Sequence, residues 1–228
     1  MALVVYGPIV SDARKKIGGI VATKGHAGNF MRKKVSPIQP RTSAQRNVRA
    51  SFTAHAKNWA GLGPSVIAAF NALAKNTPKK DRFGQTVTLT GLQLYQQLSR
   101  NIDTVGGTPL VAAPASLVAT QPGNLTVVAT HAGGTFTVVP TNYPAVGEAA
   151  AVYAGPPLGL GRQFVGKNYR FLQHFPYAGS PVAFDIEATY AAKFGAFTTG
   201  KQIAVLVKNI NITTGAAGQP SAALQATV

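Results

Sequence analysis

The stretch Ile203-Ala-Val-Leu-Val-Lys-Asn-Ile210 is rich in β-branched residues, and upstream Ala183-Phe-Asp-Ile-Glu-Ala-Thr-Tyr190 alternates apolar with polar residues. Such segments predict strands of a partly buried sheet. Further short strands are expected between turn residues at Leu117–Ala119, Leu125–Thr130, Thr135–Pro140, Ala149–Tyr153, Tyr169–His174 and Leu224–Val228. Seven or eight short strands in roughly 110 residues is the spacing of a β-sandwich. We therefore predict an all-β, Ig/fibronectin-like sandwich over residues 116–228.

The segment before the sandwich has the periodicity of amphipathic helices. A first helix is expected after Thr42, which has capping-box spacing to Gln45. Its apolar residues recur at i, i+4, i+7, i+8 and i+11, which predicts one buried stripe of Val48, Phe52, His55, Ala56 and Trp59. A second helix is expected to begin at Pro64 and to end in Thr77-Pro-Lys-Lys80, and a third to open at Thr90.

These elements predict an α+β chain with four parts. Residues 1–35 form a basic arm whose glycines suit short strands and tight turns, or an arm that stays loose until it meets a partner. Residues 36–105 form the helical module, and the Pro- and Gly-rich residues 106–115 form a linker. Residues 116–228 form the β domain.

Positive charge is concentrated in the first half of the chain. Residues 1–109 hold sixteen Lys or Arg against three acids, a net charge of +13, whereas residues 110–228 hold six against three. Such a field attracts polyanions or acidic protein surfaces. Lysine and arginine at this density would contact phosphates without reading base sequence, because no base-reading module is recognisable. The residues predicted for polyanion or subunit contact are Arg14, Lys15, Lys16, Lys24, Arg32, Lys33, Lys34, Arg41, Arg46 and Arg49.

Catalytic and metal-binding chemistry find little support in the sequence. There is no cysteine, and the four histidines are far apart without ligand spacing, so His55 is interpreted as a packed core residue. Asp185 and Glu187 would share one face of a predicted strand. Two carboxylates in this arrangement more commonly lie on a solvent-exposed face than act as an acid–base pair. We therefore expect no catalytic residues, no cofactor, no metal and no enzymatic activity. No signal peptide or membrane span is visible, which favours a virion or cytoplasmic location.

Several short motifs resemble a module of uncharacterised proteins from phages, prophages and environmental bacteria. They are Pro40-Arg-Thr42, Gln45, Arg49, Phe52, Ala56, Trp59 and Leu62, followed by Thr90-Gly-Leu-Gln-Leu-Tyr95 and Asn101. In those proteins a fibronectin type III or immunoglobulin-like domain often follows, and the second half of this chain is similar. The resemblance implies a structural component of a virion or filament, and it transfers no catalytic residues.

Two functions remain open from the sequence. The first is a non-enzymatic assembly protein, such as a phage head-associated, decoration or tail protein or the subunit of a helical fibre, which would contact copies of itself or other virion subunits. Sandwich domains with extended arms suit this role, because an arm can add a strand to a neighbour's sheet. The alternative is a sequence-independent nucleic-acid-binding protein that grips the phosphate backbone.

Overall fold

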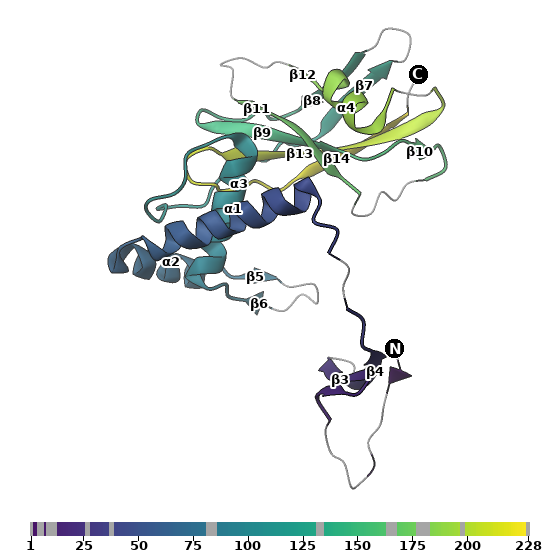
Figure 1. Ribbon diagram of the computed structural model, residues 1–228. Coiled ribbons are helices and arrows are strands. Elements are labelled where there is room, and N and C mark those ends of the chain that lie inside the picture. Colours follow the sequence, from purple (N-terminus) through teal and green to yellow (C-terminus); the bar gives the residue numbers. More distant parts are fainter. Residues whose placement is uncertain are drawn as a thin grey trace. The chain divides into compact units, whose positions relative to one another are not determined.

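The computed structural model describes residues 2–3, 7, 13–25, 28–36, 39–80, 86–130, 135–162, 168–176, 183–196 and 199–226. The chain divides into two compact units (Figure 1). Unit 1 is Met1–Asn47, and unit 2 is Val48–Val228. Four helices and several antiparallel sheets lie in the described residues, so the fold is mixed α+β as predicted.

Unit 1 contains a four-stranded antiparallel sheet with the order β1-β4-β3-β2. Gly18 and Gly19 form the two-residue turn between β2 and β3, and Gly18 has a φ of 56°, which suits glycine. The expectation of short strands and tight turns in the arm is therefore confirmed. The strands are β1 (Ala2–Leu3), β2 (Lys15–Ile17), β3 (Ile20–Gly25) and β4 (Gly28–Lys33).

Three helices precede the β-rich part: α1 (Ser43–Ala60), α2 (Pro64–Asn76) and α3 (Gly91–Val105). All three begin where the sequence predicts. The Thr42 hydroxyl accepts the Gln45 N–H at 3.3 Å, and Thr90 and Gln93 form a reciprocal capping box at α3. The rings of Trp59, Phe70 and Tyr95 pack against one another, with centroid distances of 5.4–5.7 Å. This aromatic trio holds the end of α1 to α2 and α3.

The apolar stripe predicted on α1 is buried only toward the C-terminal end of the helix. His55 is buried and Trp59 is half-buried, but Val48 and Phe52 are each 43% exposed. Ala56 is exposed as well, so the expectation of one continuous buried stripe on α1 is wrong. Sequence periodicity marks an apolar face but cannot say how far the packing partner extends along it.

The β-rich part consists of two main sheets, both antiparallel. In the larger sheet the long strand β13 (Lys201–Asn211) pairs with β9 (Glu148–Ala154), β14 (Ser221–Ala226) and β10 (Leu158–Gly159), and β9 also pairs with β11 (Arg170–Pro176). The smaller sheet has the order β12-β8-β7. Its strands are β7 (Leu125–Thr130), β8 (Thr135–Pro140) and β12 (Phe184–Asp185). A separate pair joins β5 (Lys79–Lys80) to β6 (Thr86–Val87).

One apolar core lies between the two main sheets. Val127, Phe136 and Val138 from the smaller sheet pack with Val152 and Val205 from the larger one, and all five are buried. Alternate residues of β9 and β13 therefore point into this core, as the sequence pattern predicts. The opposite face of the larger sheet receives α3 through a second cluster of Val105, Ala149, Ala151 and Ile210.

Helix α3 thus joins the helices to the sheet in a single unit (Figure 1). The structure divides the chain after Asn47, which differs from the predicted boundaries at residues 35, 105 and 115. Within the predicted linker, Leu110 is buried in the cluster that contains Phe70 and Tyr95. A Pro- and Gly-rich composition predicts the absence of regular structure, but it does not predict whether the segment packs.

Two predicted strands are wrong. Residues 183–190 form only the short β12, followed by helix α4 (Glu187–Phe194). Ile186 and Tyr190 are both buried. Their i, i+4 spacing places them on one face of a helix, and it also places them on one face of a strand, so the spacing alone does not distinguish the two. The Asp185 carboxylate accepts the Glu187 N–H at 3.1 Å at the start of α4, so these two acids do not share a strand face. The other wrong strand, Leu117–Ala119, is irregular backbone, and Leu117 packs against the helical cluster.

Candidate functional site

The basic residues predicted for contact lie mostly in unit 1. Lys15 and Lys16 belong to β2, Arg32 and Lys33 belong to β4, and Arg14 precedes β2 directly. All five are exposed. By sequence, unit 1 holds nine Lys or Arg against the single acid Asp12. The sheet therefore presents a surface of one charge sign.

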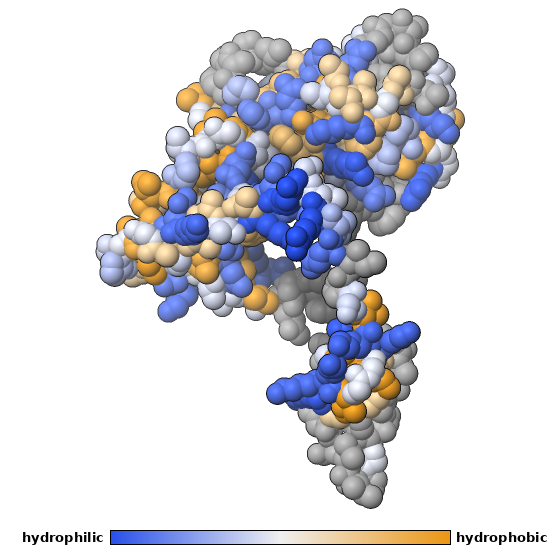
Figure 2. All heavy atoms as spheres, viewed as in Figure 1, coloured by the Kyte–Doolittle hydropathy of each residue, from blue (hydrophilic) through white to orange (hydrophobic). Residues whose placement is uncertain are grey.

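The register of the sheet distributes these bases over both faces. Lys16 is opposite Val21, which is opposite Arg32, so these three side chains share one face. Ile17 is opposite Ile20, which is opposite Lys33, and this row lies on the other face. Each face therefore mixes long cationic side chains with apolar ones, and Figure 2 shows strongly hydrophilic and hydrophobic side chains next to each other on unit 1.

The sheet of unit 1 buries very little. Among its residues with described burial, Ala22 alone is buried, whereas Ile17 and Ile20 are 59% and 47% exposed. The three hydrophobic clusters of the described chain consist of residues of unit 2. A cavity of about 290 Å³ beside β2 and β3 is lined by Arg14, Lys15, Val21, Ala22 and Thr23.

The remaining predicted contact residues lie outside this sheet or outside the described side chains. Lys34 directly follows β4, and Arg41 and Arg46 lie before and within the first turn of α1; all three are exposed. Arg49 is exposed and belongs to unit 2. The side chain of Lys24 is outside the described part of the structure.

A polar cluster in unit 2 joins α1 to α3. The Asp103 carboxylate accepts a hydrogen bond from the Ser51 hydroxyl at 2.7 Å and lies 2.8 Å from His55 Nε2. The Arg100 guanidinium donates to Ser51 Oγ at 3.0 Å and lies over the Phe52 ring, 5.5 Å from its centroid. His55 is buried, as the sequence predicts, but it is packed by a polar partner rather than by apolar residues alone.

These residues have the composition of a Ser-His-Asp triad without its geometry. In a triad the imidazole contacts the carboxylate with one nitrogen and the nucleophile with the other. Here Nε2 of His55 makes both contacts, since it also lies 3.2 Å from Ser51 Oγ. The Ser51 hydroxyl donates its hydrogen bond to the Asp103 carboxylate, and His55 Nδ1 is buried without a partner in the described residues. The cluster therefore fastens two helices together and is not arranged to activate a nucleophile.

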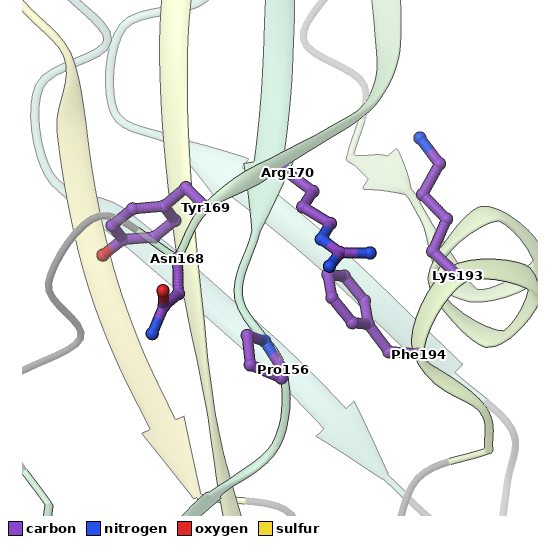
Figure 3. Close-up of a pocket in the computed structure, with 6 residues that line it drawn as sticks. All are labelled: Pro156, Asn168, Tyr169, Arg170, Lys193 and Phe194. Carbon is purple, nitrogen blue, oxygen red and sulfur yellow. The ribbon is translucent and has the colours of Figure 1, made fainter. Parts of the chain in front are cut away.

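The largest pocket of those described has a volume of about 560 Å³ and lies beside β11 and the end of α4 (Figure 3). The Arg170 guanidinium lies 5.9 Å from the centroid of the Phe194 ring, and Asn168 and Tyr169 lie on the other side of Pro156. Lys193 also lines the pocket, but its ammonium donates to the carbonyl oxygens of Phe171 and Leu172.

The chemistry of this pocket is that of a binding surface. Its six lining residues include no carboxylate, imidazole, thiol or aliphatic hydroxyl. Burial raises the pKa of the Tyr169 phenol, so the phenol keeps its proton and is a poor base. The sequence analysis did not predict this pocket, because its residues come from segments that are distant along the chain.

Comparisons with known proteins leave the family of this chain open. No protein-family model, curated protein or solved structure matches it. The resemblance to phage and prophage proteins therefore stays a prediction. In the described part of the chain, no helix is long and apolar enough to cross a membrane, and no three His, Asp or Glu side chains gather as a metal site would require.

Proposed function

We propose that this chain is a non-enzymatic structural subunit whose unit 1 docks on neighbouring subunits of an assembly. The observation that carries the proposal is that Ala22 alone is buried among the sheet residues of unit 1 whose burial is described, while Ile17 and Ile20 are exposed. A small sheet gains independent stability only when it packs an apolar face against something else. A partner surface that covers Ile17 and Ile20 would supply that packing.

The edges and the charge of unit 1 support the same role. The outer strands β1 and β2 are two and three residues long, and strand edges can extend the sheet of another chain. The net positive charge of the sheet opposes its stacking against its own copy and favours an acidic partner surface. Together with the resemblance of residues 40–101 to phage and prophage proteins, this supports a phage virion component, or the subunit of a helical fibre.

We further propose that the β-rich part of unit 2 is an Ig/fibronectin-like sandwich. In that fold, strands A, B and E form one sheet and strands G, F and C form the other, which C′ can extend. The smaller sheet has the order β12-β8-β7, corresponding to E, B and A. In the larger sheet β14, β13, β9 and β11 are neighbours in the order G, F, C and C′. Seven strands taken in chain order thus fit the fold.

A second candidate, sequence-independent nucleic-acid binding, rests on a different observation. The exposed bases of unit 1 lie on both faces of the sheet, and the cavity beside β2 is lined by Arg14 and Lys15. Both side chains could contact successive phosphates, with counterion release as the driving force.

One experiment separates the two candidates. Particle size is measured by mass photometry and electron microscopy, with and without a random-sequence DNA duplex, between about 50 and 200 mM salt, a range over which several phosphate contacts lose affinity steeply. Two variants are compared: Ile17→Ser with Ile20→Ser, and the charge reversal of Arg32, Lys33 and Lys34 to Glu. Reversal of the exposed Lys57, Lys75 and Lys80 in unit 2 to Glu controls for the change in net charge.

A structural subunit forms regular particles without DNA, and both unit 1 variants weaken their formation while the control variant does not. A nucleic-acid-binding protein instead binds DNA tightly at low salt, loses binding in the charge-reversal variant and keeps it in the isoleucine variant. A chain that stays monomeric and does not bind DNA under any of these conditions contradicts both candidates.

A further inference from the structure

Two lysines of unit 2 converge on the same helix without a carboxylate between them. Lys208, in β13, donates from Nζ to the side-chain oxygen of Asn101 at 3.3 Å. Lys79, in β5, donates to the side-chain oxygen of Gln97. Gln97 and Asn101 are one turn apart on α3, so both ammonium groups lie along one side of that helix.

Both lysines are half-buried cations. Lys208 is opposite Ala151 in the sheet register, on the face that α3 covers. Burial lowers the pKa of Lys208, and the nearby charge of Lys79 lowers it further; burial also lowers the pKa of Lys79. Among the described residues, neither ammonium lies within ion-pair distance of a carboxylate. Two partly desolvated cations that repel each other cost stability unless an anion joins them.

Space for an anion lies beside Lys79. A cavity of about 240 Å³ is lined by Lys79, Gln97, Leu98, Ala216 and Ala217, together with Thr77, Pro78, Leu94 and Leu117. A liquid water molecule takes about 30 Å³, so a group the size of phosphate or a carboxylate fits. The amide of Asn101 donates to the Gly215 carbonyl at 2.8 Å, which fixes its oxygen toward Lys208.

We propose that Lys79 and Lys208 form a binding site for an oxyanion, a phosphate or a carboxylate group, on the side of α3 that bears Gln97 and Asn101. The site lies wholly in unit 2, so it is independent of the function proposed for unit 1. A phosphate would come from a nucleic acid or a nucleotide, and a carboxylate from an acidic side chain or chain end of a neighbouring protein.

The test uses the full chain with inorganic phosphate and with acetate, each against sodium chloride at equal ionic strength. Binding is measured by isothermal titration calorimetry and by the shift in melting temperature. Lys79→Gln and Lys208→Gln are compared with Lys75→Gln, which removes the same charge from an exposed position four residues before Lys79. Saturable binding is expected in the parent chain and in Lys75→Gln, with affinity reduced at least about tenfold in each of the other two variants.

The anion that binds identifies the source. Binding of phosphate but not acetate indicates a phosphate ester, and binding of both indicates that a carboxylate of a protein neighbour can occupy the site. Equal binding in all four chains, or no saturable binding by either anion, overturns the proposal. A second measurement guards against misfolding. Without anion, Lys208→Gln is expected to melt at a higher temperature than the parent, because the substitution removes a half-buried charge that repels Lys79. A lower melting temperature would mean that Lys208 is already compensated, and would also overturn the proposal.

Discussion

Replacement of Gly215 by alanine probes the contact that joins the helices of unit 2 to its sheet. Gly215 lies in the turn after β13 with a φ of 68°, and a Cβ atom there would lie 2.4 Å from the Leu98 carbonyl oxygen on α3. Alanine at positive φ costs roughly 1–2 kcal/mol. Overpacking against backbone that cannot easily move costs about 1–3 kcal/mol more. Gly215→Ala is therefore expected to lower the free energy of unfolding by about 2–5 kcal/mol.

Gly147 provides the matched control. It has a similar φ of 79°, but no atom lies within 4 Å of where its Cβ would be. Gly147→Ala is therefore expected to show the conformational cost alone, roughly 1–2 kcal/mol. The difference between the two variants measures the close approach of the turn to α3.

Urea unfolding is the assay, followed both by far-ultraviolet circular dichroism and by the fluorescence of Trp59, the single tryptophan of the chain. Trp59 packs in the helical cluster, whereas the dichroism also reports on the sheets. Coincident transitions are expected, because α3 contributes to both the helical cluster and the contact with the sheet. Equal losses of unfolding free energy in Gly215→Ala and Gly147→Ala would refute the packing of α3 against the turn. Separate unfolding transitions by dichroism and by fluorescence would refute the joining of helices and sheets in a single unit.

Two further predictions concern the polar cluster and the core. Asp103→Ala is expected to destabilise unit 2 by about 1–3 kcal/mol, because it removes the carboxylate that accepts from the Ser51 hydroxyl and contacts the buried His55 Nε2. Asp103→Asn keeps an acceptor oxygen and should lose less stability, and equal losses in urea unfolding would contradict this role. The pKa of the Tyr190 phenol is raised by burial to about 12, so the folded state holds its proton more tightly than the unfolded state does. Its contribution to stability is fully present below the ordinary tyrosine pKa and is lost as pH rises from there toward 12. Tyr190→Phe is therefore expected to lose less stability than the parent between about pH 10 and 12, and parallel pH profiles would argue against it.

Local signals in the sequence were sufficient to predict most elements. The helices begin directly after Thr42, at Pro64 and directly after Thr90, as predicted, since the capping residues and proline act within the first turn. The predicted strands Leu125–Thr130 and Thr135–Pro140 match the structure residue for residue. The strand prediction for residues 183–190 was wrong, because the alternation of the segment indicates a strand while the spacing of Ile186 and Tyr190 also fits the helix that forms.

The candidate site could be predicted only in part. The basic residues of unit 1 are visible as a run of positive charge, and their exposure agrees with that reading. The pairing of Lys79 with Lys208 has no sequence signal, since they are separated by more than a hundred residues and lie in different sheets. The same holds for Asp103 with Ser51 and His55, which approach only because α1 packs on α3.

The sequence by itself determined most of the helices and strands, and it determined that unit 1 carries a strong positive charge, because capping, periodicity and charge act through neighbours along the chain. Only the tertiary structure decided that the helices and the β-rich half share one unit, that the segment around Leu110 packs, and that Ile17 and Ile20 stay exposed. Burial depends on which distant surfaces meet, and a residue's own sequence environment carries little information about them. The exposure of the unit 1 sheet and the lack of a counter-charge for the lysines beside α3 are therefore consequences of packing. A protein partner could cover the first, and an anion could neutralise the second.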